Sequence, residues 1–126
     1  MTTTPTIWKA SFIANSGATA GVQSNSQTIG LADGGILTVW ESDTQDADGV
    51  DIHGQVFTAE GLLSGRISLG RSLNGINSAD EIRPKLLALP GGDVVLAYTS
   101  QHGPGSTPPG SKLIVDRFNI DTFVGF

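Results

Sequence analysis

Apolar residues recur along this chain in short runs bounded by glycine, serine, asparagine or aspartate, a pattern typical of β-strands joined by polar turns. The Gly34-Gly35 and Gly91-Gly92 pairs fall between neighbouring runs, where tight hairpin turns are needed. A helix starting at Ser78 would be broken by Pro84, so a short turn is expected there. The sequence predicts an all-β protein with eight short strands, at residues 8–15, 26–32, 35–42, 51–58, 65–71, 83–89, 93–100 and 112–119.

This strand pattern occurs twice along the chain. The segment Leu31–Trp40, which reads LADGGILTVW, aligns with Leu89–Tyr98, which reads LPGGDVVLAY, at an offset of 58 residues. Downstream, Asp51–Phe57 aligns with Lys112–Phe118 at an offset of 61 residues, because the preceding loop is longer in the second copy. An internal repeat fixes the architecture before any motif is considered. We expect a single domain over residues 1–126, built from two four-stranded antiparallel repeats at about 8–65 and 66–126.

The pattern within each strand predicts how the repeats pack. Ile36–Trp40 and Val94–Tyr98 are apolar on both faces, as expected of strands covered on both sides. Asp51–Phe57 and Lys112–Phe118 carry polar residues, as outer strands do. This combination is typical of a β-propeller blade, and an eight-stranded β-sandwich is the alternative. Because two blades cannot close a ring, we expect a homo-oligomer, a piece of a longer repeat chain, or a sandwich.

Composition narrows the class of protein. Charged residues are 15% and hydrophobic residues 38% of the 126 residues, which fits a folded domain with many polar turns. A net charge of −5 with scattered basic residues argues against a nucleic-acid partner. No cysteine is present, and no apolar run approaches the roughly 20 residues that span a bilayer. The first residues lack the features of a secretory signal peptide.

The densest polar cluster is an acidic loop that contains Asp43, Asp46, Asp48 and Asp51. Spaced carboxylates in a glycine-containing loop can supply the oxygen ligands that Ca²⁺ prefers, so these four residues are candidate calcium ligands. The alternative is an exposed acidic hairpin loop that keeps the sheet edge soluble. The corresponding loop of the second repeat, residues 101–110, contains no carboxylate. Calcium binding is therefore expected in the first repeat only, if at all.

Two tryptophans are the candidate ligand-binding residues. Trp40 or Trp8 could stack against a sugar ring, although aromatic residues at repeat-equivalent positions, such as Trp40 and Tyr98, are also common core spacers. An enzyme that cleaves polysaccharide would need two carboxylates across a cleft, and Glu41 with Asp43 or Asp116 are the candidates. His53 and His102 lack the neighbours that a metal site or a catalytic triad requires, so both are expected to be structural.

The first repeat resembles repeats of large secreted, RTX-associated bacterial proteins. Those repeats read Leu-Ala-Asp-Gly-Gly, an apolar strand to Trp, an Asp/Gly loop, Gly-Gln-x-Phe and a later Gly, as this chain does from Leu31 to Gly61. The second repeat departs from the pattern, with Pro90 in the turn and Tyr98 in place of Trp. The resemblance implies an extracellular protein that is exported without an N-terminal signal peptide. It does not by itself imply calcium, because the Gly-Gly-x-Gly-x-Asp repeats are absent.

These observations together favour a non-enzymatic binding or adhesion module of a secreted bacterial protein, with a carbohydrate or another cell-surface ligand as its partner. The alternatives are an enzyme acting on polysaccharide through acidic residues, and a structural spacer in a long repeat chain.

Overall fold

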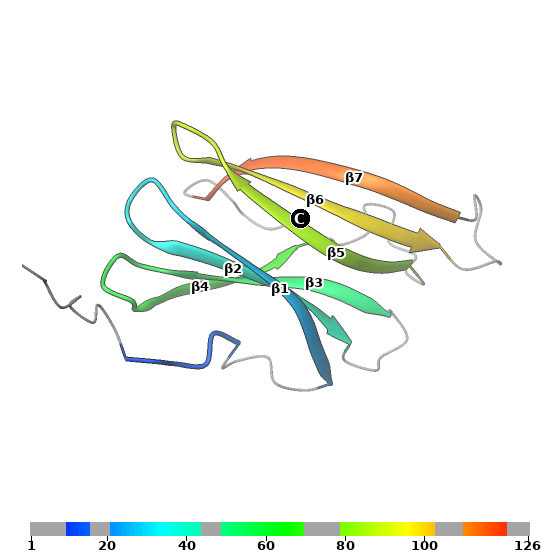
Figure 1. Ribbon diagram of the computed structural model, residues 1–126, viewed down its shortest axis with the longest axis horizontal. Coiled ribbons are helices and arrows are strands. Elements are labelled where there is room, and N and C mark those ends of the chain that lie inside the picture. The colour runs from blue at the N-terminus through cyan, green and yellow to red at the C-terminus, as the bar shows by residue number, and fades with distance from the viewer. Residues whose placement is uncertain (1–9, 16–20, 44–48, 70–78, 103–109, 121–126) are drawn as a thin grey trace, which may run out of the picture.

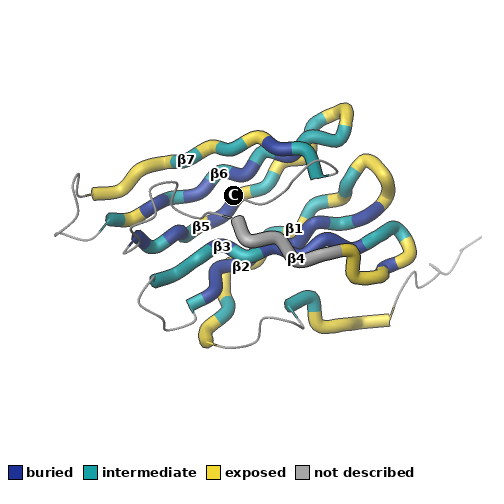
Figure 2. The backbone as a smooth tube through the Cα atoms, turned by 180° about the vertical axis from the view of Figure 1, so that it is seen from behind, coloured by how far each residue is buried: buried dark blue, intermediate teal, exposed yellow. Residues whose placement is uncertain are grey.

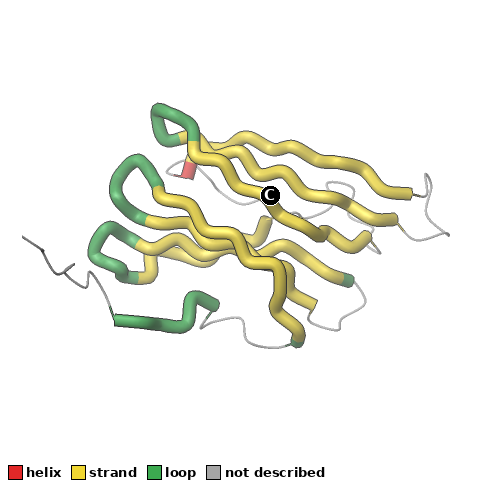
Figure 3. The backbone as a smooth tube through the Cα atoms, viewed as in Figure 1, coloured by secondary structure: helices red, strands yellow, loops and turns green. Residues whose placement is uncertain are grey.

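The computed structural model describes residues 10–15, 21–43, 49–69, 79–102 and 110–120, among which seven β-strands lie in two layers (Figure 1). A four-stranded antiparallel sheet has the order β1-β2-β3-β4 and is called the first sheet, and a three-stranded sheet, β5-β6-β7, is called the second sheet. The expected all-β fold with antiparallel sheets is confirmed (Figure 3). The described residues contain no α-helix, and the short red segment is a single residue of 3₁₀ conformation, Ile120. The strands are β1 (Val22–Gly30), β2 (Ile36–Asp43), β3 (Val50–Phe57), β4 (Leu63–Leu69), β5 (Ala79–Ala88), β6 (Asp93–His102) and β7 (Gly110–Asn119).

The glycine pairs form tight hairpin turns, as the sequence predicts. In the first repeat the Leu31 N–H donates to the Gly35 carbonyl at 2.8 Å, and the Gly34 N–H donates to the Leu31 carbonyl at 3.0 Å. The second repeat has the same two bonds at positions 58 residues later. Gly34 and Gly92 have φ values of +87° and +93°, a conformation that glycine adopts without steric penalty.

The strands differ from the sequence prediction in three places. The short turn expected before Pro84 is instead the first part of β5, whose bulge contains this proline. Residues 10–15, which belong to the predicted strand 8–15, are not a strand, and the rest of that segment lies outside the described residues. The predicted strand 65–71 does not begin the second repeat, because β4 pairs with β3 through a short turn closed by Thr58 and Leu62. As a result β3 is a buried central strand rather than an outer one. Closing a local hairpin costs less conformational entropy than closing the longer loop of a crossover to the other sheet, so β4 pairs readily with β3.

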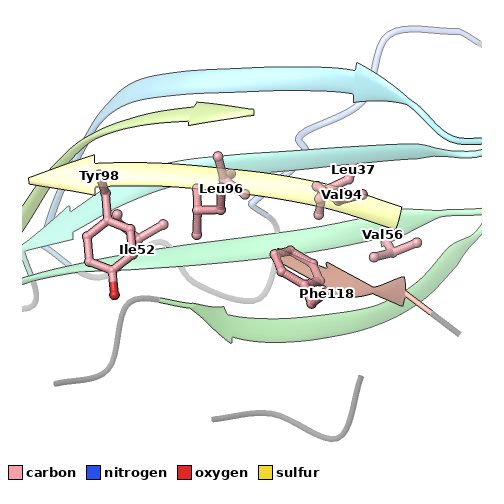
Figure 4. Close-up of a cluster of buried hydrophobic side chains, with 8 residues drawn as sticks. Leu37, Ile52, Val56, Val94, Leu96, Tyr98 and Phe118 are labelled. Atoms are coloured by element: carbon pink, nitrogen blue, oxygen red, sulfur yellow. The ribbon is translucent and has the colours of Figure 1, made fainter. Parts of the chain in front are cut away.

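The hydrophobic core lies between the two sheets (Figure 4). Both faces of β2 are buried, which confirms the expectation for Ile36–Trp40 (Figure 2). The corresponding expectation for Val94–Tyr98 is wrong, because burial alternates along β6 and Val95 and Ala97 are only half-buried. No described element forms a layer outside the second sheet. The core cluster consists of Leu37, Val39, Ile52, Val56, Val94, Leu96, Tyr98 and Phe118.

The two sheets stack face to back. Residues Val94, Leu96 and Tyr98 of the second sheet face the core, but their repeat equivalents in the first sheet, including Thr38 and Trp40, lie on the face away from it. The first sheet instead turns the alternate residues of β2 toward the core. Successive blades of a β-propeller also stack with the front of one sheet on the back of the next. Here no further described strand packs on the outer face of either sheet.

Each repeat also carries a β-bulge at the same position. The register shifts between Ser24 and Gln27 in β1 and between Ile82 and Lys85 in β5. Within the bulges, Asn25 and Arg83 are the described non-glycine residues with positive φ, at 49° and 59°. Pro84 follows Arg83, at a bulge position where a proline removes no ladder hydrogen bond. The β-bulge is therefore part of the repeated unit. It shifts the backbone of β1 and of β5 at equivalent positions.

Candidate functional site

A polar pocket of about 380 Å³ lies on the face of the first sheet that is turned away from the second sheet. Its floor is formed by β1 and β2, and its wall includes the end of the segment 10–15, which crosses that face (Figure 1). Its volume is at the lower end of the range of about 300–1,000 Å³ that is usual for small-ligand sites. The described lining residues are Ala14, Asn15, Gln23, Ser24, Asn25, Ser26, Thr28, Thr38 and Trp40.

The pocket is polar because the first repeat has polar residues where the second repeat has core residues. Thr28 and Thr38 are cross-strand neighbours whose hydroxyl oxygens are 2.8 Å apart, within hydrogen-bond distance. Their equivalents, Leu86 and Leu96, face the core of the protein. Packing another apolar layer against this threonine pair would bury hydroxyl groups, which is unfavourable when their remaining hydrogen bonds are lost. The first sheet thus presents a hydrogen-bonding surface at this place.

Trp40 forms the buried end of the pocket. Its side chain is 3% exposed and stacks against the His53 ring, with the ring centroids 6.3 Å apart and the planes at 22°. Its Nε1 atom is buried and has no hydrogen-bond partner among the described residues. Gln55 is the residue opposite Thr38 in the register, and its Oε1 atom is also buried without a hydrogen-bond partner among the described residues. Buried polar atoms are usually paired, so unpaired ones beside a pocket point to a ligand or ordered water.

Glu41 holds the bulge that shapes the rim of the pocket. One carboxylate oxygen accepts hydrogen bonds from the Asn25 amide at 2.8 Å and the Ser24 hydroxyl at 3.1 Å. The other accepts the backbone N–H of Arg83, in the bulge of the second sheet, at 2.5 Å. Glu41 is buried, and these donors satisfy its charge. The carboxylate therefore fixes the bulges of both repeats.

The segment 10–15 partly covers the same face. The ring of Phe12 packs on the ring of Phe57 with centroids 4.8 Å apart and planes at 55°, a tilted geometry that aromatic pairs favour. Ala14 and Asn15, a few residues later, line the pocket. The position of the wall therefore depends on the contact between Phe12 and the sheet.

A second polar group lies at the start of β5. The Ser100 hydroxyl donates to a carboxylate oxygen of Glu81 at 3.3 Å, and the His102 Nε2 is 3.4 Å from the same hydroxyl. Burial, followed by the negative charge of Asp51, raises the pKa of the Glu81 carboxyl from 4.5 to about 7. The equivalent pair in the first repeat is Gln23 with Ser42, in which the Gln23 amide donates to the hydroxyl at 3.0 Å. The second repeat thus places an ionisable group where the first has a neutral amide.

The structure locates some of the sequence-predicted site residues and not others. Trp40 lies at the pocket, while Trp8, Asp46 and Asp48 lie outside the described residues. Asp43 pairs with Val50 and Asp51 with Ser42, so the two aspartates occupy adjacent register positions, whose side chains start on opposite faces of the sheet. The described residues contain no group of three or more His, Asp or Glu side chains arranged to hold a metal ion. Calcium binding by the acidic loop stays a prediction.

The carboxylates considered for hydrolysis occupy different surroundings. Glu41 is engaged by the donors that hold the bulges. Asp116 lies on β7 opposite Leu96, on the core side of the second sheet, and its charge helps to raise the pKa of the Tyr98 hydroxyl after the larger effect of burial. Neither carboxylate lines the pocket among its described residues, although Glu41 accepts hydrogen bonds from two residues that do.

Sequence reasoning identified Trp40 but missed the polar residues around it. Gln23 and Thr28 lie in β1, whose polarity reads as solvent exposure, and Thr38 lies in a strand that reads as apolar on both faces when each repeat is considered alone. The signal that could have found them is the comparison of the two repeats, since Thr28 and Thr38 replace two core leucines.

Comparison of the chain with protein-family models, with curated proteins and with solved structures gives no match. In the part of the chain that the structure describes, no helix has the length and apolar character needed to cross a membrane.

Proposed function

We propose that this chain is a non-enzymatic binding module whose pocket on the first sheet takes a neutral carbohydrate. The observation that carries this proposal is the buried Trp40 Nε1, which has no hydrogen-bond partner among the described residues and belongs to a residue that lines the pocket. Leaving a buried donor unpaired costs about 1–3 kcal/mol. A ligand oxygen that accepts this hydrogen bond would recover that free energy on binding.

The chemistry of the lining supports a carbohydrate. Amide groups from Asn15, Gln23 and Asn25 and hydroxyl groups from serine and threonine supply donors and acceptors that match sugar hydroxyls. Among the described lining residues none carries an ionisable side chain. A charged ligand would therefore lack an opposite charge in the pocket, whereas a neutral polyol would find hydrogen-bonding partners.

The resemblance to repeats of secreted, RTX-associated bacterial proteins supports an extracellular setting for this module. In that setting the carbohydrate would be part of a cell surface, and the module would contribute to adhesion. Other repeats of a longer chain, or other copies of this chain, would then add to the strength of attachment through multivalency.

A pair of conservative substitutions tests the proposal. Trp40→Phe keeps an aromatic ring in the sheet and removes the indole N–H, and Tyr98→Phe makes the matched change at the repeat-equivalent core position. Titration of neutral oligosaccharides that bind the unaltered protein on a glycan array should show about tenfold weaker binding for Trp40→Phe. Tyr98→Phe should bind normally. Equal affinity of all three proteins, or no glycan binding at all, would exclude a carbohydrate site at this pocket.

A further inference from the structure

The outer face of the second sheet exposes an apolar patch. Leu87 is 58% exposed, Leu113 74% and Val115 61%. The register places Leu87 and Val115 on the same face as the half-buried Val95 and Ala97, opposite the core. Lys85 and Arg117 lie on this face as well, and Arg117 forms an ion pair with Asp93 at 2.6 Å. We call this surface, made of Lys85, Leu87, Leu113, Val115 and Arg117, the second-sheet patch.

The face-to-back stacking indicates what kind of element this patch fits. In the first sheet the repeat-equivalent face carries Leu37, Val39 and Ile52 and is covered by the second sheet. In the second sheet the equivalent face points away from the core, and no described element covers it. Another layer of the same kind would continue the stack that the two repeats have begun.

The opposite end of the stack exposes a second apolar patch. On the outer side of the first sheet, Phe12 is 41% exposed, Ile13 68% and Leu63 55%. Phe12 packs on Phe57, and Leu63 is the partner of Phe57 in the register, so these residues are neighbours. We call Phe12, Ile13 and Leu63 the first-sheet patch.

The two ends differ in charge in a way that selects how copies would meet. The turns beside the first-sheet patch carry Asp33 and Glu60, whereas the second-sheet patch carries Lys85 and Arg117, of which Arg117 is paired with Asp93. Two first-sheet patches brought together would place these carboxylates against their copies, and two second-sheet patches would place Lys85 against its copy. A first-sheet patch against a second-sheet patch brings Asp33 and Glu60 toward Lys85, which favours association.

We propose that the second-sheet patch binds the first-sheet patch of a second copy of this chain, in a head-to-tail contact. This interface is heterologous, so after the contact forms the pair of copies retains one free patch of each kind, one on each copy. The inference goes beyond the proposed function, because the contact is made by exposed apolar side chains at the Phe57 end of the outer face, beside the pocket, and needs no carbohydrate.

Two charge-changing variants and their mixture test this contact. Leu113→Glu places a negative charge on the second-sheet patch, and Ile13→Lys places a positive charge on the first-sheet patch; both positions are exposed, so the fold should persist. In sedimentation velocity from micromolar to millimolar protein, the unaltered chain should self-associate reversibly. Each variant alone should associate at least about tenfold more weakly. The equimolar mixture should regain association, because each variant retains the patch that the other lacks.

A matched control and the contrary outcomes make the test decisive. Val22→Glu changes an apolar residue of similar exposure, 58%, at the other end of the first sheet from Phe57, and should associate like the unaltered chain. Circular dichroism melting curves verify that all variants are folded. A monomeric unaltered chain would overturn the proposal. So would a single variant that self-associates as strongly as the unaltered chain, because this reveals a contact between identical patches, or a mixture that associates no better than the single variants.

Discussion

Replacing Glu81 by glutamine should remove a pH dependence of stability that the buried carboxyl creates. Burial and the negative charge of Asp51 raise the pKa of Glu81 from 4.5 to about 7 in the folded protein, so the native state binds the proton more tightly than the unfolded chain does. The carboxyl is then compatible with the fold below pH 4.5 and destabilises it increasingly as the pH rises to 7. At roughly 1.4 kcal/mol for each pKa unit, the loss amounts to about 3 kcal/mol.

The substituted amide keeps the local hydrogen bonding. Gln23 occupies the equivalent position in the first repeat and donates to Ser42 at 3.0 Å, so a glutamine at position 81 can bond to Ser100 in the same way. The variant should match the unaltered protein near pH 4 and exceed it in stability by up to about 3 kcal/mol at pH 8. The surrounding groups are the same in both proteins, so the difference between the two isolates Glu81.

Urea denaturation of both proteins from pH 4 to pH 8.5 measures this difference. The exposed Glu60→Gln is the control, and its stability should follow that of the unaltered protein at every pH. A Glu81→Gln protein that is less stable at pH 8, or whose advantage does not vary with pH, would show that the carboxyl is ionised without penalty in the fold.

Three further changes test other features. Glu41→Ala should lower the free energy of unfolding by about 2–4 kcal/mol in urea, because donors in both bulges lose their acceptor; a loss under 1 kcal/mol would refute this role. Gly35→Ala should lower the melting temperature more than Gly30→Ala, because a β-carbon at 35 would clash with the Phe57 carbonyl, whereas the one at 30 meets nothing and Gly30 has no positive φ; the reverse order would refute the packing. If the acidic loop binds calcium, millimolar Ca²⁺ should raise the melting temperature by several degrees over EDTA, with about 2.7 kcal/mol gained at a hundredfold excess over Kd. Asp46→Asn with Asp48→Asn should abolish that rise, and identical curves for the unaltered protein would show a solvated loop.

The sequence predicted local structure better than it predicted the site. The hairpins at Gly34 and Gly92 follow from glycine's freedom at positive φ, which is a property of a few neighbouring residues. The assignment of β4 to the first sheet was not predicted, because the alternating run at 65–71 has the same appearance whichever sheet it joins. The pairing depends on the turn at 58–62, which closes a local hairpin between β3 and β4.

The pocket was harder to predict, because the way the two sheets stack decides which residues lie together on the outer face. Thr38 is polar and Trp40 aromatic in either arrangement of the sheets, and the choice of which face meets the core decides that both line the outer side. That choice rests on the packing of Leu37 and Val39 against the second sheet, which periodicity alone could not separate from the alternative, since β2 is buried on both faces.

The position of Glu41 has a consequence for how the chain unfolds. Its carboxylate lies in the first repeat and accepts a backbone hydrogen bond from the second, so separating the repeats would leave a buried charge with fewer partners. In repeat proteins, cooperativity depends on how strongly each unit is coupled to its neighbour relative to its own stability. A coupling that involves Glu41 and both bulges makes partly unfolded forms, with one repeat intact, poorly populated. The two repeats should therefore melt in one transition and behave as a single thermodynamic unit.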